Sequence, residues 1–387
     1  MKKNPSLIMH CQYVYGIGHF VRSIEIAHAL KNEFNVCLVI GGEKILNFPI
    51  PDGITIAHLP AIYKNETTGN LIPIDSSLSL ESCFEQRGRQ LEQLVKAWQP
   101  DIVVTEHFPF GLLFEKEVLQ MLKLARDINP NSMIVSSIRD VIDSASGGNH
   151  DAHICSLINK WFDLILVHGD PRFITLNESF PLLEQITTPH IYTGYVVSKP
   201  DPRCKRNGPP LLLGSIGGGR IGQELLSALR AAHRHLVHDW EHELILFKGA
   251  FDIETVEDDE PCSSLHIQNF DRIAYRKALA QADGVICLGG YNSISESLSM
   301  QLPTLVYKRK FIGSNHEQAL RAELFKLSGL IKTIEEEDLE TQQLVKLMSA
   351  FFKEHITTPP TIDFLGAENT CRIMLSSWQA HQQRVGI

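Results

Sequence analysis

One histidine lies where a general base is expected. Residues 15–22 read Tyr-Gly-Ile-Gly-His-Phe-Val-Arg and join an apolar run to a segment with helical periodicity. The glycines Gly16 and Gly18 allow a tight turn and a close approach to a ligand. His19 then begins the helix, where the dipole disfavours the imidazolium ion, so we expect a pKa below neutrality and a ring that can accept a proton. We predict that His19 is the general base; capping or packing is the alternative for a single histidine.

Two further loops combine glycine with the start of a helix. Residues 215–220 read Ser-Ile-Gly-Gly-Gly-Arg, and residues 288–298 read Leu-Gly-Gly-Tyr-Asn-Ser-Ile-Ser-Glu-Ser-Leu. Glycine lets main-chain N–H groups approach an anion, and the helix dipole favours negative charge there. Both loops therefore predict a phosphate site, to which Arg220 adds a cation. Residues 215–220 match neither the G-x-G-x-x-G nor the P-loop pattern, and for them a tight strand-to-helix turn is the alternative.

Acidic and amide side chains accompany the second of these loops. Glu296 lies one turn into its helix, where a carboxylate can accept hydrogen bonds from two vicinal hydroxyls, as toward ribose. Stabilisation of the helix start is the alternative. Residues 315–322 read Asn-His-Glu-Gln-Ala-Leu-Arg-Ala at the start of another helix. This segment brings Glu317 and Gln318 to the side where ligands bind in parallel sheets.

Polar residues also close two predicted strands in the first half of the chain. Glu106 follows the apolar residues 102–105, and Arg139 and Asp140 come just after residues 133–137. Because ligands bind at the carboxyl ends of parallel strands, all three are candidates for substrate contacts. A structural salt bridge is an equal alternative for Arg139 and Asp140.

No metal site is predicted. His235, His238 and His242 recur with helical spacing, but no carboxylate or cysteine completes a metal-ligand set. Residues 149–153, Asn-His-Asp-Ala-His, are interpreted as a mobile polar loop, with a metal loop as the alternative. The sequence contains no D-x-D motif either.

These loops need regular elements to position them. Short apolar runs alternate with helical patterns along most of the chain, which is typical of βα units in parallel sheets. The predicted strands are residues 6–10, 36–40, 102–105, 133–137 and 164–167 in a first series and 211–215, 243–248, 265–268, 285–288 and 304–307 in a second. The predicted fold class is α/β, with two doubly wound Rossmann-like domains that face each other across a cleft.

Proline marks the boundary between the two series. Residues 198–210 hold four prolines among charged residues and can continue neither a helix nor a central strand. We assign residues 1–197 to an N-terminal domain, residues 198–210 to a linker and residues 211–358 to a C-terminal domain. Residues 359–387 contain a further helical pattern and are expected to pack back on the N-terminal domain.

The composition excludes several classes of protein. With 387 residues, 43% of them hydrophobic and 21% charged, the chain is a folded protein of two or three domains. The net charge of −9 argues against a nucleic-acid partner. The eight cysteines are scattered without a C-x-x-C pair, as reduced core residues are. No apolar stretch reaches the roughly 18 residues of a membrane span, and residues 1–5 lead straight into a strand-like run, so we expect a cytoplasmic protein.

Taken together, these motifs resemble those of a known family. Over nearly its whole length the sequence is similar to the two-domain (GT-B fold), metal-independent nucleotide-sugar glycosyltransferases of the peptidoglycan UDP-N-acetylglucosamine transferase superfamily. It is most similar to uncharacterised predicted glycosyltransferases with a G-x-G-H-x-x-R loop. The matching blocks are residues 16–22, 106–111, 137–140, 289–303 and 317–322. Residues 289–292 read Gly-Gly-Tyr-Asn where the peptidoglycan enzyme has an Arg-Ser-Gly pattern, so its lipid acceptor is not carried over.

The resemblance implies roles for individual residues. Glu296, seven places before Pro303, matches the acid that holds the donor ribose, and Gln318 matches a glutamine that contacts the donor sugar. The glycine loops are assigned to the diphosphate, and the main chain near Phe270 to the nucleobase. With the loop arguments above, the expected donor-binding residues are Gly217, Gly218, Gly219, Arg220, Phe270, Gly289, Gly290, Asn292, Ser293, Glu296, Glu317 and Gln318. The expected acceptor-side residues are Gly16, Gly18, Arg22, Glu106, Arg139 and Asp140.

The expected function is metal-independent, inverting transfer of a sugar from a nucleoside-diphosphate sugar, UDP-linked, to an acceptor hydroxyl. His19 would remove the proton of that hydroxyl as it attacks the anomeric carbon, while helix N-termini and Arg220 stabilise the leaving diphosphate. The expected partners are the nucleotide-sugar donor and an acceptor that the sequence does not identify. No cofactor is expected, and neither nucleic acid nor a peripheral membrane contact is indicated.

Two other classes of protein stay open. Nucleotide-sugar hydrolases of nonulosonate synthesis are similar too, sharing the G-x-G-H-x-x-R loop and a late Gly-Gly-x-Asn block, and in them the same histidine would activate water. Residues 62–98 offer an acceptor-binding surface that a hydrolase does not need. A non-catalytic nucleotide-sugar-binding protein would bind the donor without turnover.

Overall fold

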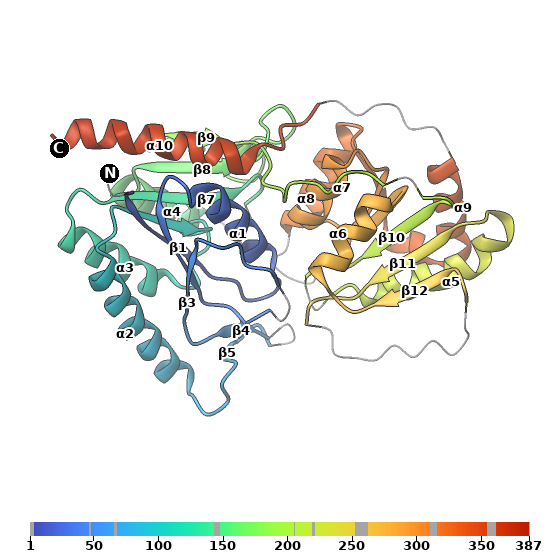
Figure 1. The fold of residues 1–387 in the computed structure, drawn as a ribbon, viewed down its shortest axis with the longest axis horizontal. Helices are drawn as coiled ribbons and strands as arrows, with labels where there is room; N and C mark the ends of the chain where they lie inside the picture. Colours follow the sequence, from blue (N-terminus) through green and yellow to red (C-terminus); the bar gives the residue numbers. More distant parts are fainter. Residues whose placement is uncertain are drawn as a thin grey trace.

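The computed structural model describes residues 4–45, 48–65, 68–142, 148–204, 206–218, 221–251, 262–309, 316–353 and 361–386. They form two α/β domains that lie next to each other along the longest axis of the molecule (Figure 1). Each domain is built on a parallel sheet with helices on both faces, so apolar cores lie on both sides of each sheet.

The N-terminal domain contains a seven-stranded parallel sheet. Its strands run in the order β3 (Thr55–His58), β2 (Asn35–Ile40), β1 (Ser6–Cys11), β6 (Ile102–Glu106), β7 (Met133–Arg139), β8 (Leu164–His168) and β9 (His190–Tyr192). Its helices are α1 (Gly18–Leu30), α2 (Leu80–Trp98), α3 (Glu115–Ile128) and α4 (Gly148–Trp161), with the short 3-10 turns η1 (Leu176–Glu178) and η2 (Leu183–Gln185). An antiparallel pair, β4 (Ile62–Lys64) and β5 (Leu71–Pro73), lies outside the sheet.

The side chains of β1 explain why helices cover both faces of this sheet. Successive residues of a strand point to opposite faces. Leu7 and Met9 join a core with residues of α1 and of the last helix, α10 (Gly366–Val385), whereas Ile8 joins a core with residues of α2 and α3. A central parallel strand must therefore be apolar at consecutive positions, as this one is.

The C-terminal domain contains a six-stranded parallel sheet. The strands run in the order β12 (Leu265–Gln268), β11 (Glu243–Phe247), β10 (Leu211–Ser215), β13 (Gly284–Leu288), β14 (Thr304–Tyr307) and β15 (Lys332–Ile334). The helices are α5 (Gln223–Asp239), α6 (Arg272–Gln281), α7 (Tyr291–Ser299), α8 (His316–Leu327) and α9 (Thr341–Lys353), with a 3-10 turn η3 (Glu336–Leu339). In the part of the chain that is described, no helix is both long and apolar enough to cross a membrane.

Both sheets reverse their strand order at one point. In the first sheet β1 lies between β2 and β6, and in the second sheet β10 lies between β11 and β13. At such a switch point the connections leave toward opposite faces, and a ligand site opens outside the carboxyl ends of the two central strands. The loops after β1, β6, β10 and β13 are therefore the places where the fold positions functional side chains.

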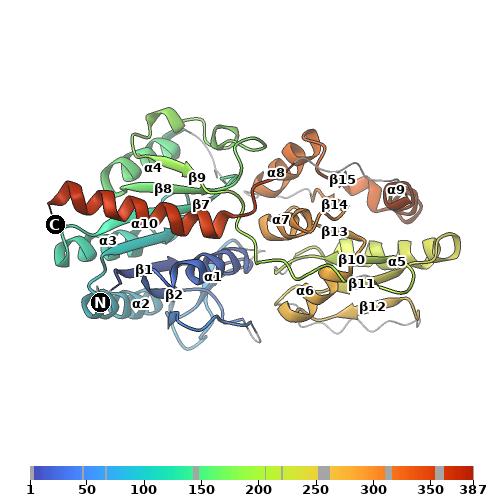
Figure 2. The same cartoon turned by 45° about the horizontal axis from the view of Figure 1, so that its top comes forward.

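The last helix returns to the first domain. Figures 1 and 2 show α10 lying along the N-terminal domain beside α1, and Ala367 and Met374 of α10 are buried in its core. The returning segment is bonded to the one that leaves this domain. Tyr195 N–H donates to Asp363 O at 2.7 Å, and Gly366 N–H donates to Tyr195 O at 3.1 Å.

The predicted α/β class with two doubly wound domains is confirmed. Each of the ten predicted strands corresponds to a strand of the two sheets, with ends that differ by two residues at most. The strands that the apolar pattern missed are β3, β4, β5, β9 and β15. They are three or four residues long, at sheet edges or in the separate pair, and too short to show a period.

One interpretation was wrong. Residues 149–153, expected to form a polar loop, lie in the first part of α4. Asp151 stands in the first turn of this helix, where the positive end of the dipole stabilises a carboxylate. The Nε2 atom of His153 lies 2.8 Å from Glu115 Oε1 at the start of α3, so this polar side chain links the helix α4 to α3.

Candidate active site

His19 and Glu106 lie together at the switch point of the first sheet. His19 is the second residue of α1, and Glu106 is the last residue of β6. The Nδ1 atom of His19 lies 2.8 Å from Glu106 Oε1. Because a carboxylate only accepts hydrogen bonds, Nδ1 carries the ring proton, and Nε2 has the lone pair that can accept another. This is the arrangement of a general base with an orienting carboxylate.

Arg22 lies on the other side of the same carboxylate. Its Nη2 donates to Glu106 Oε1, and its guanidinium lies 5.1 Å from the centre of the Tyr291 ring. Nη2 is also 3.4 Å from His19 Nδ1, but since both atoms carry hydrogen this contact is not a hydrogen bond. Burial and the neighbouring charge of Arg139 lower the pKa of Arg22 to about 9, so it stays charged at neutral pH.

The surroundings keep His19 neutral. Burial, followed by electrostatic repulsion from Arg139, His107 and Arg22, holds the pKa of His19 well below its ordinary value of 6.5. The ring of His107 lies 5.2 Å from that of His19, and burial with Arg139 lowers its own pKa to about 4. At neutral pH the Nε2 lone pair of His19 is therefore unprotonated and can act as a base.

The glycine loop after β10 touches the first domain. Gly217 has a φ of +72°, which glycine adopts without strain, and its N–H donates to Ser215 Oγ at 3.0 Å. A Cβ on Gly218 would lie 2.0 Å from Ile17 Cγ1, so only glycine lets the two loops approach this closely. Gly219 and Arg220, both expected to bind the diphosphate, lie outside the described residues.

The glycine loop after β13 also reaches the first domain. Gly290 caps the start of α7, and the described chain has no atom within 4 Å of the place where its Cβ would lie. Asn292 Nδ2 donates to Gly18 O at 3.0 Å, and Ser293 Oγ lies 3.4 Å from the Cβ position of Gly217. A Cβ on Gly289 would lie 2.6 Å from the main-chain oxygen of Gln318. The predicted donor loops therefore lie together and adjoin the loop that carries His19.

Glu296, the predicted ribose ligand, is already in a buried ion pair. Arg272 donates to both of its oxygens, from Nη1 to Oε2 at 3.0 Å and from Nη2 to Oε1. Arg272 Nη2 also donates to Ser198 Oγ at 2.7 Å, in the segment that joins the domains. Each carboxylate oxygen has a second acceptor position, so a ribose would share Glu296 with Arg272.

Arg139 and Asp140 do not pair with each other, because adjacent residues at a strand end point in different directions. Arg139 Nη1 donates to both oxygens of Glu317, at 2.5 and 2.6 Å, across the domain junction. Arg321 of α8 donates to Asp140 Oδ1 and to Glu317 Oε1, both at 2.7 Å. Burial alone would raise the pKa of Glu317, but Arg139 and Arg321 hold it well below its ordinary value. Two arginines and two carboxylates thus join the domains in a neutral network.

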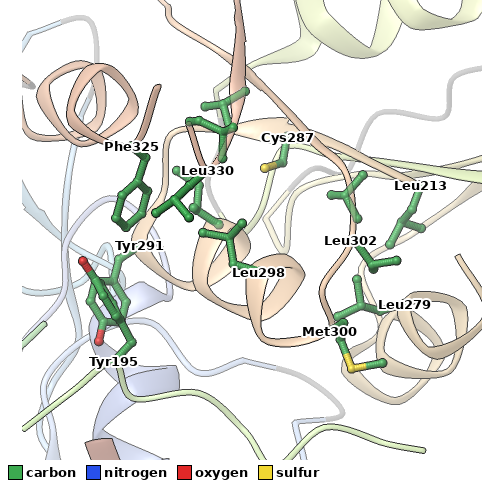
Figure 3. Packing of buried hydrophobic residues seen from close by; sticks show 14 of the residues in the cluster. Tyr195, Leu213, Leu279, Cys287, Tyr291, Leu298, Met300, Leu302, Phe325 and Leu330 are labelled. Atoms are coloured by element: carbon green, nitrogen blue, oxygen red, sulfur yellow. The ribbon is translucent and has the colours of Figure 1, made fainter. Parts of the chain in front are cut away.

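An apolar contact lies beside this network. Tyr195, in the segment that leaves the first domain, packs on Tyr291 of α7 with ring centres 5.7 Å apart, and Phe325 of α8 lies 5.7 Å from Tyr195 (Figure 3). The hydroxyl of Tyr291 accepts a hydrogen bond from Val196 N–H at 2.8 Å. Tyr291 follows Gly290, so the predicted donor loop is also part of the domain junction.

The structure thus gathers most of the predicted residues around the junction of the two domains. Gly18, His19, Arg22, Glu106, Arg139 and Asp140 come from the first domain, and Gly217, Gly218, Gly289, Asn292, Ser293 and Glu317 from the second. Gly16 is half-buried in the loop before α1, and Gln318 is half-buried in the first turn of α8. Phe270 is half-buried two residues after β12 and directly precedes the N-cap of α6.

Sequence reasoning missed several residues of this region. Arg272, Tyr291 and Arg321 carry charge or aromatic contacts at the junction, but nothing in the local pattern separates them from ordinary helix residues. Ser137 donates to Glu106 Oε2 at 2.9 Å and His168 lies 2.9 Å from Ser137. A signal for these two was present, since each is a polar residue at the end of an otherwise apolar predicted strand.

Comparison with known proteins gives a partial sequence match. No family model matches the chain. A UDP-N-acetylglucosamine--N-acetylmuramyl-(pentapeptide) pyrophosphoryl-undecaprenol N-acetylglucosamine transferase of Clostridium novyi (strain NT) is 27% identical over 180 residues. This match covers 45% of the present chain and 46% of the relative, so the chain spans about half the length of the curated relative that it matches.

Solved structures match over the whole chain. The calicheamicin glycosyltransferase CalG4 has a TM-score of 0.60 at 15% identity, with 100% of both chains covered. A Listeria monocytogenes protein assigned as a UDP-N-acetylglucosamine 2-epimerase also has a TM-score of 0.60, at 12% identity over 99% of this chain and 97% of its own. At these identities the likeness concerns the fold alone. The chain therefore has the two-domain fold of the glycosyltransferases called GT-B.

Proposed function

We propose that the chain is a glycosyltransferase that moves a sugar from a nucleoside-diphosphate sugar to a hydroxyl of an acceptor. The observation that carries this proposal is the pair of His19 Nδ1 and Glu106 Oε1, 2.8 Å apart at the switch point of the first sheet. The pair adjoins the helix-starting loops of the second domain, through the bond from Asn292 to Gly18 O. A neutral base beside a candidate diphosphate site is what direct sugar transfer requires.

In the proposed reaction His19 Nε2 takes the proton of the acceptor hydroxyl. The acceptor oxygen forms its bond to the anomeric carbon on the face opposite the diphosphate, and the electron pair of the broken bond leaves with the diphosphate oxygen. The configuration at that carbon is therefore inverted. Glu106, bonded to Nδ1–H, stabilises the imidazolium formed on His19.

For the donor, the proposal assigns the diphosphate to main-chain N–H groups of Gly217, Gly218 and the start of α7. Such groups point at an anion where a helix begins, and the open space beside Gly290 supports this placement. Glu296 would bind the ribose, and Gln318 the sugar. A UDP-linked donor is supported by the partial sequence match to a UDP-N-acetylglucosamine transferase. The neutralising groups in this proposal are main-chain N–H groups and Arg220, so we propose that no metal is needed.

The test is turnover of a panel of UDP-sugars and dTDP-sugars by the purified protein, with and without cell extract as acceptor source. Mass spectrometry would measure both free nucleotide and new glycoside. A transferase gives glycoside that depends on the extract, with slow donor loss in its absence, and keeps this activity in excess EDTA. Loss of activity that only manganese or magnesium restores would contradict the metal-free version.

Two outcomes would replace the proposal. Rapid release of nucleotide without any acceptor would identify a nucleotide-sugar hydrolase, in which His19 activates water. Tight donor binding without release of nucleotide under any condition would identify a non-catalytic nucleotide-sugar-binding protein.

A further inference from the structure

A chain of buried polar side chains lies behind Glu106. Ser137 Oγ, on β7, donates to Glu106 Oε2 at 2.9 Å. His168, the last residue of β8, has its Nε2 2.9 Å from Ser137 Oγ and its Nδ1 2.8 Å from Thr193 Oγ1. Ser137, His168 and Thr193 are fully buried. The proposed function uses none of these three residues.

The direction of each hydrogen bond in this series of side chains follows from Glu106. Glu106 is paired with Arg22 and accepts at both oxygens, so the hydroxyl hydrogen of Ser137 is directed at Oε2. Ser137 Oγ must then accept at its other contact, and His168 Nε2 must carry a hydrogen. Burial, with the charge of Arg22, holds the pKa of His168 well below its ordinary value, so the ring is neutral and its Nδ1 carries no hydrogen. The hydroxyl of Thr193, which also lies 2.9 Å from Gly194 O, is then the donor that faces Nδ1 at 2.8 Å.

Both oxygens of the Glu106 carboxylate, which faces His19, accept hydrogen bonds. Oε1 accepts from His19 Nδ1 and from Arg22, and Oε2 accepts from Ser137. A carboxylate held at both oxygens cannot rotate about its last bond. It therefore fixes the direction of His19 Nδ1–H, and with it the direction of Nε2.

The other charged and titratable groups around this chain belong to several elements. They are Arg22 on α1, Cys11 on β1, His107 after β6, Arg139 on β7, Tyr291 on α7 and Glu317 on α8. The substitutions at His168 change none of these residues, so we assign a change in the titration of the His19–Glu106 pair to the side chains behind Glu106.

We propose that His168 is a positioning residue for the base. As the Nε2–H tautomer it directs Ser137 toward Glu106 and so holds His19 ready to accept a proton. The role of His19 rests on the proposed function, whereas the tautomer of His168 does not.

Two substitutions at His168 separate its donor from its acceptor. In His168→Gln the amide nitrogen can take the place of Nε2–H, whereas in His168→Asn the shorter side chain reaches only the place of Nδ1 and leaves Ser137 without a donor. For His168→Asn we expect kcat about ten-fold lower and the donor KM within about two-fold. For His168→Gln we expect kcat within about three-fold of the wild type.

The pH profile separates positioning from a merely structural role. In Ser137→Ala the carboxylate of Glu106 loses a hydrogen-bond donor, and in His168→Asn that donor, Ser137, is no longer held by His168 Nε2–H. Both changes favour proton uptake by the His19–Glu106 pair, whichever member takes the proton. The acid limb should therefore move to higher pH in His168→Asn and in Ser137→Ala and stay in place in His168→Gln. The control is His233→Asn, which removes an equally buried histidine, bonded to Ser264 at 3.0 Å, in the other domain. An unmoved limb in both His168→Asn and Ser137→Ala, or equal losses for His168→Gln and His168→Asn, would overturn the proposal.

A second measurement does not depend on activity. Nitrogen NMR of the protein labelled in histidine, with His19 and His168 assigned by substitution, reports which ring nitrogen carries hydrogen at neutral pH. We expect hydrogen on Nε2 of His168 and on Nδ1 of His19. Hydrogen on Nδ1 of His168 overturns the inference, even in an active enzyme. The expected tautomers in a protein without turnover support the chain of hydrogen bonds and overturn only the proposed function.

Discussion

At the scale of single residues, the chemistry of His19 is set by its neighbours. Glu106 holds Nδ1–H, and burial with the charges of Arg139 and Arg22 keeps the pKa of the ring low. The same ring on an exposed helix would be partly protonated near neutrality and free to rotate. Its place between a carboxylate and two guanidinium groups therefore turns an ordinary histidine into a candidate base.

His19→Ala should lower kcat by about 10²–10⁴-fold, because a general base contributes about that much to the chemical step. The dissociation constant of the donor should stay within a few-fold, since the proposed donor contacts belong to the other domain. The pH profile should also lose its acid limb, which in the wild type lies below the ordinary histidine value of 6.5 because the pKa is lowered. Steady-state kinetics across pH, with calorimetry for donor binding, measures all three.

The control is His153→Ala, which removes an exposed histidine on α4, away from the candidate site. A near-normal kcat in His19→Ala would show that His19 only shapes its loop, and Glu106 or Asp140 would be the next base to test. Lost donor affinity with turnover retained at saturation would instead place His19 against the nucleotide sugar.

Glu296→Gln should weaken binding of the free nucleoside diphosphate by about 1–3 kcal/mol, because charge-assisted bonds to the ribose hydroxyls are lost. It should also lower the melting temperature, since Arg272 then remains buried without its carboxylate. Calorimetry on the folded variant separates the two effects. Arg272→Gln breaks the same ion pair and leaves the carboxylate in place. Equal, unchanged affinity in both variants would remove Glu296 from the donor site.

At the scale of elements, α2, α3 and β1 are tied together by one buried ion pair. Arg87 of α2 donates to both oxygens of Glu117 of α3, from Nε at 2.6 Å and from Nη2 at 2.8 Å. His10 of β1 lies 3.2 Å from the same carboxylate. Burial alone would raise the pKa of Glu117, but the bonds from Arg87 and His10 outweigh it and lower the pKa to about 2. This tie fixes the helices that flank the sheet behind the site.

A lowered pKa makes the tie depend on pH. Its contribution to the free energy of unfolding is complete above the ordinary value of 4.5 and is lost as the pH falls toward 2. The shift corresponds to about 3 kcal/mol. Urea unfolding from neutral pH to pH 2 should therefore show the stability difference between wild type and Glu117→Gln shrinking by about that amount. Glu85→Gln, which breaks an exposed pair with Arg89 on α2, should show no such trend, and a constant difference for Glu117→Gln would contradict the assignment.

Strands could be predicted from the sequence where consecutive residues are buried. β1, β6 and β13 are apolar at consecutive positions, and that local pattern alone identifies a central parallel strand. β9 and β15 have three residues each, and they are strands only because a neighbouring strand offers hydrogen bonds. Residues 149–153 look like a loop because most of them are polar, yet they lie in the first part of a helix.

The sequence indicated the individual residues of the candidate site but not which of them contact each other. His19, Glu106 and Glu317 were found because each follows a strand or starts a helix, which is a local property. The bond from His19 to Glu106 spans 87 positions, and that from Arg139 to Glu317 spans 178. Such contacts depend on which strands are neighbours and on how two domains meet, and no local spacing encodes either.

At the scale of the whole molecule, the junction between the two domains depends on one glycine, Gly218. The loops after β1 and β10 meet where Gly218 faces Ile17, and α7 reaches the same loop through Asn292. The domain arrangement that brings the predicted donor loops to His19 therefore requires that Gly218 have no side chain.

Gly218→Ala should push the loops apart, because the new Cβ would lie 2.0 Å from Ile17 Cγ1. Overpacking of this kind costs about 1–3 kcal/mol, here against the closed arrangement rather than the fold of either domain. We expect kcat/KM to fall about ten-fold or more and small-angle scattering to show a larger radius of gyration. Adding Ile17→Ala, which removes the clashing atoms, should restore both.

Gly88→Ala on α2 is the matched control, since its Cβ meets no described atom within 4 Å. It should leave activity and radius unchanged. A Gly218→Ala protein that is fully active, or one that Ile17→Ala fails to rescue, would show that the contact between the loops does not set the domain arrangement.

The return of α10 to the first domain has a consequence for how the protein is made. The N-terminal domain is discontinuous, because Ala367 and Met374 complete a core that begins with Leu7 and Met9. On the ribosome, that core stays open while the whole of the other domain is synthesised. The second sheet and its helices, continuous from β10 to α9, can be completed earlier. The first half of the chain to be translated is therefore the last to finish folding.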